Sequence, residues 1–406
     1  MSGDGQPRNG EAPPISAAAF ASSFGESILK AIDLATWRVG RDLSDDYVRI
    51  DREVRDAVGR ETSYQRVYRE RVFPQLQTRN GAPKNAGVHA ADIEIIKAIH
   101  RDLLFRGGVE ACDGAIQVHA TLPLTIYQVG VSLVSYQGSE NAWGQRLFRR
   151  DLRQSFDDPV EEAIALLERR ARPIGSGDDG MGELIQKALL DYAERAILAR
   201  RSKARWRMGH GNPITYELLT GGSNLDLMVA GTNVIRELVN SHPHFVFVAS
   251  EPKDRLLFTI AQALHPMEFA IVGTLKEQLD DWLHQRRFAI NAEAKLMWDD
   301  EAIRAPDWIP RFIETVASQI VVGLFRASMH APAQLFYAHV DYADYAAHVV
   351  LADSVLNELR GAPMLIGFAR HVCDAIFGDT LAGLAESAYL LAGAPGRFSN
   401  QRTNRQ

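Results

Sequence analysis

The spacing of apolar residues predicts a chain that begins with helices. Phe20, Phe24, Ile28 and Ile32 recur in steps of four within residues 15–37, which places them on one face of a helix. The charged segment that follows keeps apolar residues in steps of three and four, and this again favours a helix. The same periodicity predicts helices at 43–72, 91–104, 159–170, 181–201, 226–240, 253–264, 274–286, 345–360 and 363–377.

Runs of β-branched and apolar residues predict strands between these helices. Residues 108–134 are rich in β-branched side chains and predict two or three strands in a hairpin or meander. The run 245–249 is apolar throughout and bounded by turn residues, which is typical of a buried strand. Further strands are expected at 205–210, 268–273, 320–328 and 334–340, the last two as an antiparallel pair. Strands joined partly by hairpins and partly by helices predict an α/β fold with a mixed sheet.

The two ends of the chain differ from its middle in composition. Residues 1–15 have almost nothing to bury and are expected to form a disordered tail, and residues 393–406 a flexible one. No repeat or clear linker divides the part between them. We therefore predict one large domain over residues 16–392, whose helical N-terminal part covers 16–104.

The bulk composition limits the function classes. The chain has 406 residues, 46% of them hydrophobic and 24% charged, with a net charge of −6. An acidic protein binds a polyanion only through a local basic face or a metal ion. Cys112 and Cys373 are the only cysteines, which excludes a disulfide scaffold and a CxxC metal cluster.

Several sequence signals are absent. The chain lacks a P-loop, a GxGxxG that opens a helix and a GxSxG, so an ATPase, a Rossmann enzyme and an α/β hydrolase have no support. It also lacks a signal peptide and an apolar run long enough to cross a membrane. A cytoplasmic protein without membrane contact is expected.

The leading candidate for chemistry is Asp113, within 111–115 (Ala-Cys-Asp-Gly-Ala). A strand that ends in Asp-Gly can turn sharply, because Gly114 tolerates positive φ, and the carboxylate then points outward. Asp-Gly is also among the strongest hairpin signals, so an ordinary turn is the alternative.

The most basic stretch of the chain lies around residue 200. Phosphate contacts and base stacking on Trp206 are the functional interpretation, and a solvated helix end is the alternative. The cationic residues proposed to contact nucleic acid here are Arg200, Arg201, Lys203, Arg205 and Arg207, next to Arg195.

The order of elements and four short motifs resemble the NurA family, nucleases that act beside HerA-type hexameric ATPases in DNA end processing and phage defence. The resemblance covers roughly residues 105–380 and implies an RNase H-like fold, a mixed sheet flanked by helices, with a helical N-terminal extension. The motifs are Val109-Glu-Ala-Cys-Asp113-Gly114-Ala115, Tyr192-Ala-Glu194-Arg195-Ala196, Met208-Gly-His210-Gly-Asn-Pro-Ile214 and Ala362-Pro-Met-Leu-Ile-Gly-Phe-Ala-Arg370-His371.

The resemblance implies a role for each matching residue. Asp113 and Glu194 would hold a divalent metal, Mn²⁺ or Mg²⁺. His210 stands where the family has a second Asp, as the third ligand. The C-terminal motif implies an active-site His, carried over to His371 with Arg370 as the neighbouring possibility.

The resemblance also implies a substrate and partners. Lys253, just beyond the strand 245–249, matches a lysine of the family and would contact nucleic acid. DNA would be the substrate, a HerA-like hexameric ATPase the partner, and a homodimer the assembly.

His210 bears on whether such a site is active. RNase H-like sites hold two metal ions among several carboxylates. Imidazole suits Mn²⁺ tolerably and Mg²⁺ poorly. Three interpretations stay open: a Mn²⁺-preferring nuclease, a site completed by another acid such as Glu217, or a degraded site in a DNA-binding or regulatory partner. An unrelated α/β scaffold protein is a further alternative.

Other residues compete for these roles. Glu194 can also be a boundary residue paired with a nearby arginine, and Glu161, Glu162 or Glu183 could take its place. His371 can be an ordinary helix-face histidine. The same caution applies to His119, His339 and His348.

Overall fold

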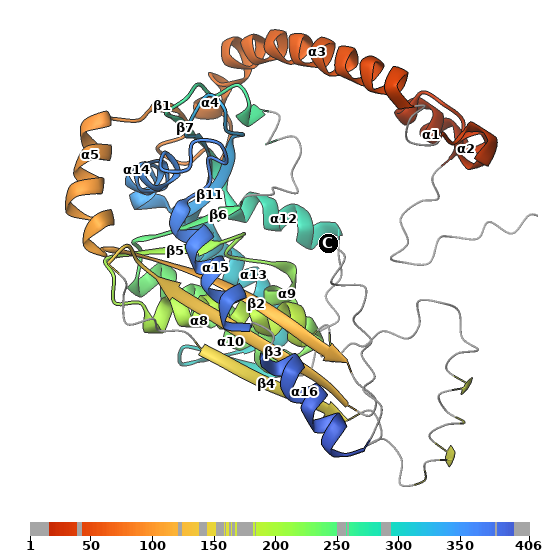
Figure 1. Cartoon of the computed structure of the whole chain (residues 1–406). Coiled ribbons are helices and arrows are strands. Elements are labelled where there is room, and N and C mark those ends of the chain that lie inside the picture. The colour runs from red at the N-terminus through yellow and green to blue at the C-terminus, as the bar shows by residue number, and fades with distance from the viewer. Residues whose placement is uncertain are drawn as a thin grey trace, which may run out of the picture. The chain divides into compact units, whose positions relative to one another are not determined.

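A computed structural model gives the structure of the chain (Figure 1). It divides into two compact units, residues 1–64 and residues 65–406, which we describe separately. The residues that the structure describes are 16–38, 43–120, 124–137, 144–151, 184–249, 260–285, 294–377 and 380–393, with isolated positions at 158–182 and at 257. Both predicted tails, apart from Gly393, lie outside these residues.

The first unit is helical, but its first helix is shorter than the periodicity predicts. α1 (Ala17–Phe24) ends at Gly25, whose φ of 72° reverses the chain. The side chain of Ser27 then accepts a hydrogen bond from the Lys30 amide and starts α2 (Ile28–Ile32). A continuous helix over 15–37 is therefore wrong, because a left-handed glycine and a new N-cap interrupt it. α3 (Ser44–Val67) runs on into a π-helical turn at Tyr68–Val72, which confirms the helix expected at 43–72.

The second unit contains a nine-stranded mixed sheet. The strands follow the order β1-β7-β10-β11-β6-β5-β2-β3-β4 across it. Their bounds are β1 Gly87–Ala90, β2 Val109–Ala120, β3 Leu124–Val134, β4 Gly144–Asp151, β5 Trp206–His210, β6 Phe245–Ala249, β7 Glu268–Thr274, β10 Ile320–Arg326 and β11 Gln334–His339. A separate hairpin joins β8 (Lys295–Trp298) to β9 (Glu301–Arg304).

Three neighbouring strands of this sheet run parallel. β5 pairs in parallel with β2 on one side and with β6 on the other, whereas the remaining neighbours are antiparallel. The register sets Cys112 of β2 opposite Gly209 of β5, and the pairing of these two strands stops there. The mixed sheet flanked by helices confirms the predicted fold class.

Helices cover both faces of the sheet (Figure 1). One core, which includes Cys112 and Val131, packs against α8 (Leu190–Arg201), α10 (Leu225–Ser241) and α13 (Ala305–Thr315). The other core, which includes Ala111 and Met208, packs against α5 (Ile93–Asp102), α14 (Ala343–Ser354) and α15 (Met364–Phe377). Side chains of a strand alternate between faces, so Asp113 and His210 project to the side of α15.

The sequence pattern missed several short elements. Among the described residues these are α4 (Gln75–Thr78), β1, β4, the β8–β9 hairpin, α9 (Tyr216–Thr220), α13 and α16 (Thr380–Leu391). Most of the helices expected at 159–170 and 253–264 falls outside the described residues. α12 (Leu275–Gln285) confirms the helix expected at 274–286. No helix of the described chain has the length and hydropathy to span a membrane.

A buried carboxylate ties α14 to α15 and makes stability depend on pH. Asp353 is fully buried and accepts hydrogen bonds from the Tyr136 hydroxyl at 2.5 Å and the Leu365 amide at 2.9 Å. Burial raises the pKa of Asp353 to about 6, although both hydrogen bonds oppose the rise. Because the folded chain holds this proton more tightly than the unfolded chain, stability falls as pH rises from about 4 to about 6.

We expect Asp353→Asn to remove this dependence. The free energy of unfolding of the native chain should fall by about 3 kcal/mol relative to the variant across that pH range. Urea unfolding at several pH values measures the difference. The exposed carboxylate of Asp344 on the same helix gives the control, Asp344→Asn. Parallel pH curves for the native chain and Asp353→Asn would contradict the expectation.

Candidate active site

Asp113 lies inside a strand, and the predicted turn is wrong. β2 continues through Asp113 and Gly114, and Asp113 pairs with Ser132 of β3. Gly114 is also not among the residues with positive φ. The parallel neighbour β5 nevertheless ends beside this point, since its last partner on β2 is Cys112. The carboxylate therefore lies at the carboxyl end of the parallel part of the sheet, as a strand-end carboxylate would.

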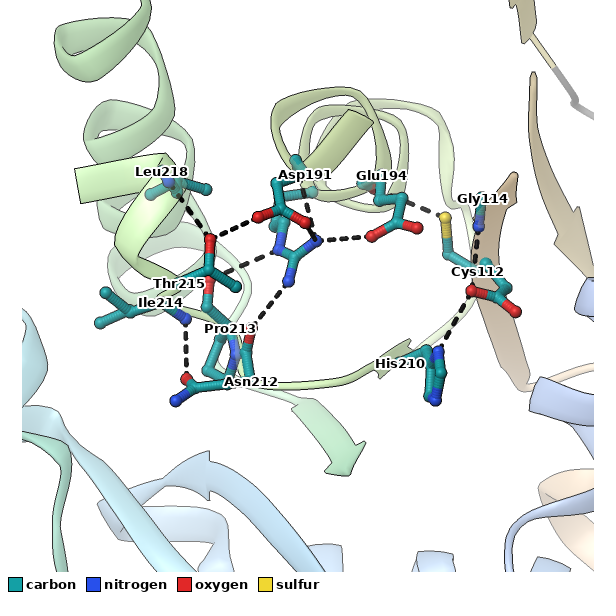
Figure 2. Close-up of polar contacts among 12 residues, drawn as sticks. Cys112, Gly114, Asp191, Glu194, His210, Asn212, Pro213, Ile214, Thr215 and Leu218 are labelled. Carbon is teal, nitrogen blue, oxygen red and sulfur yellow. Dashed lines mark hydrogen bonds and ion pairs between the residues drawn. The ribbon is translucent and has the colours of Figure 1, made fainter. Parts of the chain in front are cut away.

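His210 is the last residue of β5 and lies next to Asp113. Its Nδ1 is 3.3 Å from Asp113 Oδ1, and Gly211 with φ of 80° then turns the chain away (Figure 2). The hydrogen bond with Asp113 raises the pKa of His210, and burial opposes this rise. The Asp113 side chain is only 4% exposed and that of His210 is 29% exposed, so solvent reaches the pair through the imidazole.

Glu194 approaches the same place from α8, on the other face of the sheet. A β-carbon added at Gly114 would lie 2.7 Å from Glu194 Oε1 and 2.8 Å from Leu190 Cδ1. The missing side chain at Gly114 is therefore what lets the carboxylate reach the strand end. The Asp-Gly pair serves close approach here, and not the sharp turn that the sequence suggested.

Burial governs the electrostatics of Glu194. It raises the pKa of this carboxyl to about 7. Arg195 opposes the rise, Asp113 and Asp191 add to it, and His210 opposes it weakly. Glu194 and these four groups therefore form one electrostatic cluster.

Arg195, the next residue of α8, is a buried cation of this cluster. Its side chain is 2% exposed, and its Nη1 donates to Glu194 Oε2 at 2.5 Å. The guanidinium also donates to the carbonyl of Asn212 at 2.7 Å and to that of Pro213 at 3.4 Å. Arg195 thus links Glu194 to the loop that follows His210. The pairing of Glu194 with a nearby arginine, left open by the sequence, is present.

The two cysteines flank Asp113 on opposite faces of β2. Cys112 Sγ donates to the carbonyl of Glu194 at 3.4 Å, and Cys373 Sγ donates to the carbonyl of Asp113 at 3.2 Å. Burial raises the pKa of both thiols, so they are protonated packing groups. Sequence reasoning missed this role, because a lone cysteine gives no signal of what it will contact.

α15 carries both Arg370 and His371, whose side chains are exposed. Ala369 and Cys373 form the buried face of the helix, where the Ala369 carbonyl accepts from Ser132 Oγ at 2.6 Å. Arg370 is close enough to His210 to lower its pKa. His371 lies on the exposed side of the helix.

The basic stretch lies at the other end of β5. Trp206 starts the strand and His210 ends it, so the two are roughly 13 Å apart along the chain direction. Trp206 and Arg207 are buried, and Arg207 donates to the carbonyls of Leu198 and Ser202. Arg207 therefore holds the end of α8, and neither residue can form an exposed stacking surface. The exposed cations of the stretch are Arg200, which pairs with Glu237 at 2.9 Å, and Arg201, Lys203 and Arg205.

Of the competing residues, those within the described part of the chain have separate places. Glu217 lies on α9, and Glu161 is exposed. Glu162, Glu183 and Lys253 lie outside the described residues. His348 accepts a hydrogen bond from the Asp92 amide at 3.0 Å and is a buried structural histidine, as the cautious interpretation held.

The donor set fits a divalent cation by its chemistry. Two carboxylates and an imidazole are ligands that Mn²⁺ accepts. Each carboxylate already has one oxygen engaged, since Asp113 Oδ1 also accepts from the Gly114 amide at 3.0 Å and Glu194 Oε2 from Arg195. Within the described part of the chain, no three His, Cys, Asp or Glu side chains are arranged around one metal position. Asp113 and Glu194 could hold one such ion, with His210 beside it.

Comparison with known proteins finds likeness in structure but not in sequence. No family model and no curated protein matches the chain. The NurA nuclease from Sulfolobus solfataricus superposes with a TM-score of 0.48 at 10% identity, over 87% of this chain and 98% of that chain. A second NurA structure gives 0.43 at 9% identity, over 84% and 96%. NurA bound to dAMP and manganese gives 0.34 at 11% identity, over 82% and 93%.

Proposed function

We propose that this chain is a NurA-like, divalent-metal-dependent DNA nuclease. The observation that carries the proposal is the contact of Asp113 with His210 beside the end of β5, with Glu194 packed against Gly114 on the other face of β2. These residues come from β2, α8 and β5, and each stands in one of the motifs that resemble the NurA family. A buried pair of carboxylates beside an imidazole and an arginine is suited to hydrolysis of a phosphodiester.

Each residue has a role in the proposed reaction. A bound Mn²⁺ would polarise the phosphate and lower the pKa of water. Asp113 and Glu194 supply the negative charge that holds the ion. His210, whose Nδ1 faces Asp113, can hold or transfer a proton at its Nε2. Arg370, exposed beside His210, is placed to attract the phosphate.

Cleavage of labelled DNA tests the proposed activity. We expect the purified chain to cut single- or double-stranded DNA with Mn²⁺, to cut it more slowly with Mg²⁺, and to stop when EDTA is added. An RNA of the same sequence serves as the comparison for substrate class. If neither ion supports cleavage of any of these substrates, the proposal of a nuclease is overturned.

The second candidate is a binding subunit whose site no longer catalyses. The Glu194–Arg195 ion pair and His210 in the position of an expected Asp favour it. Such a subunit would bind DNA with an affinity that Mn²⁺ and EDTA leave unchanged. It would also bind its ATPase partner.

A HerA-type hexameric ATPase is the proposed partner, and the sequence resemblance supports it. Co-purification of this chain with the HerA-like ATPase of its own genome tests the pairing. Stimulation of DNA cleavage by that ATPase in the presence of ATP is the expected result, and absence of binding would argue against it.

We propose that the chain forms a homodimer and that α3 contributes to it. Apolar side chains form one stripe along α3 and are exposed: Tyr47, Ile50, Val54, Val58 and Tyr64. Beside the stripe, Glu53 lies one heptad before Arg60, and both are exposed. An antiparallel copy of α3 would set Glu53 of each chain against Arg60 of the other. This pairing of opposite charges favours a second copy of the chain as the partner that covers the stripe.

A charge exchange tests this dimer. We expect Arg60→Glu to weaken dimerisation about tenfold, since it sets like charges together, and the double variant Glu53→Arg with Arg60→Glu to restore it. Arg52→Glu, on the opposite side of the helix, is the control. Sedimentation equilibrium measures the dissociation constant. A monomeric native chain, or a double variant as weak as Arg60→Glu, would contradict the proposal.

A further inference from the structure

The most unusual charge in the described chain is Arg195, a guanidinium buried beside the proposed metal position. Its side chain is 2% exposed. Besides Glu194, it contacts Asp191 twice, through the carbonyl at 3.2 Å and through Oδ1 at 3.3 Å. An arginine keeps its charge at every accessible pH, so this cation is permanent.

The surroundings hold Arg195 in place. Two carbonyls of the loop after His210, those of Asn212 and Pro213, accept from it. The loop is itself fixed, because the Ile214 amide donates to Asn212 Oδ1 at 2.9 Å and Thr215 Oγ1 donates to Asp191 Oδ2. Figure 2 shows this ring of contacts between α8 and the loop. Moving the guanidinium would leave several buried polar groups without partners.

Arg195 limits what the cluster can hold, because it sets a permanent positive charge against the carboxylates of Glu194 and Asp191. A second divalent ion would need Glu194 Oε2, which Arg195 already contacts at 2.5 Å, and it would stand against a fixed positive charge.

We propose that Arg195 is a built-in cation that takes the place of a second metal ion, so that the site binds a single Mn²⁺. This inference rests on the proposed metal-dependent nuclease. The two-ion arrangement that serves RNase H-like chemistry would then be one metal ion plus one guanidinium. Arg195 acts through Glu194 and the loop, and is a positioning residue.

Counting bound Mn²⁺ on the full chain tests the proposal without any activity assay. Electron paramagnetic resonance of free Mn²⁺ gives the number of ions bound, and ions lost in Asp113→Asn are those of the site. One such ion per native chain is the expected result. Two bound ions per chain would overturn this inference but would leave the proposed nuclease intact. A chain that binds no Mn²⁺ at the site would overturn both proposals.

Two substitutions at Arg195 sharpen the count. Arg195→Met removes the charge with similar bulk, and we expect it to bind a second ion. Arg195→Lys keeps the charge and should bind one. One ion on Arg195→Met would overturn the role given to Arg195. If thermal unfolding shows that Arg195→Met does not fold, the number of Mn²⁺ ions bound by the native chain decides the proposal by itself.

Discussion

Replacement of Asp113 by asparagine is expected to abolish Mn²⁺-dependent DNA cleavage, with a loss of roughly 1,000-fold or more. The loss corresponds to about 4 kcal/mol of transition-state stabilisation, a size typical of a metal ion that is no longer held. Folding should change little. Asparagine keeps an oxygen that can accept from the Gly114 amide, and the substitution removes a negative charge that Glu194 senses.

The control for this variant is Asp374→Asn. Asp374 is an exposed carboxylate on α15, the helix that also carries Arg370. We expect its cleavage rate to match that of the native chain. Initial rates on labelled DNA and thermal unfolding of each protein make the comparison. If a folded Asp113→Asn protein cleaves DNA as fast as the native chain, Asp113 is not a site residue. That result would also contradict the proposed nuclease.

The second large effect is expected from a single methyl group at Gly114. Alanine there would place its β-carbon 2.7 Å from Glu194 Oε1 and 2.8 Å from Glu194 Cγ, closer than such atoms approach in proteins. The Glu194 side chain must then leave the strand end. We expect a loss of cleavage of at least tenfold with weaker Mn²⁺ binding, and a stability cost of about 1–3 kcal/mol from overpacking against Leu190.

Gly367→Ala provides the matched control for Gly114→Ala. A β-carbon at Gly367, on α15, meets nothing within 4 Å. Its cleavage rate and Mn²⁺ affinity should equal those of the native chain. If Gly114→Ala cuts DNA and binds Mn²⁺ as the native chain does, Glu194 does not act at this position.

The elements that the sequence predicted well are those whose signal lies within a short window. β6 is apolar throughout, and α3 repeats its apolar residues every three or four positions, so burial or periodicity alone indicates the structure. α1 and α2 were joined in error because the same periodicity continues across Gly25. There a left-handed turn, which periodicity does not register, ends the first helix.

The candidate site was predictable only in part. Asp113 and His210 could be chosen because motifs at two strands named them, but their contact depends on the parallel register of β2 and β5. Arg195 and Arg207 looked like members of an exposed basic stretch, and both are buried. Which arginine of a charged run is buried depends on the helix phase and on the carbonyls that tertiary packing brings near it.

By itself, the sequence determined the α/β class, most of the long helices and strands, and the three segments that carry Asp113, Glu194 and His210. The tertiary structure alone decided that Asp113 lies within a strand, that Gly114 admits Glu194, and that Arg370 lies near enough to His210 to lower its pKa. The physical reason is that periodicity and composition report which side of an element is buried. Register, helix phase and close approach depend on residues that are distant in the chain.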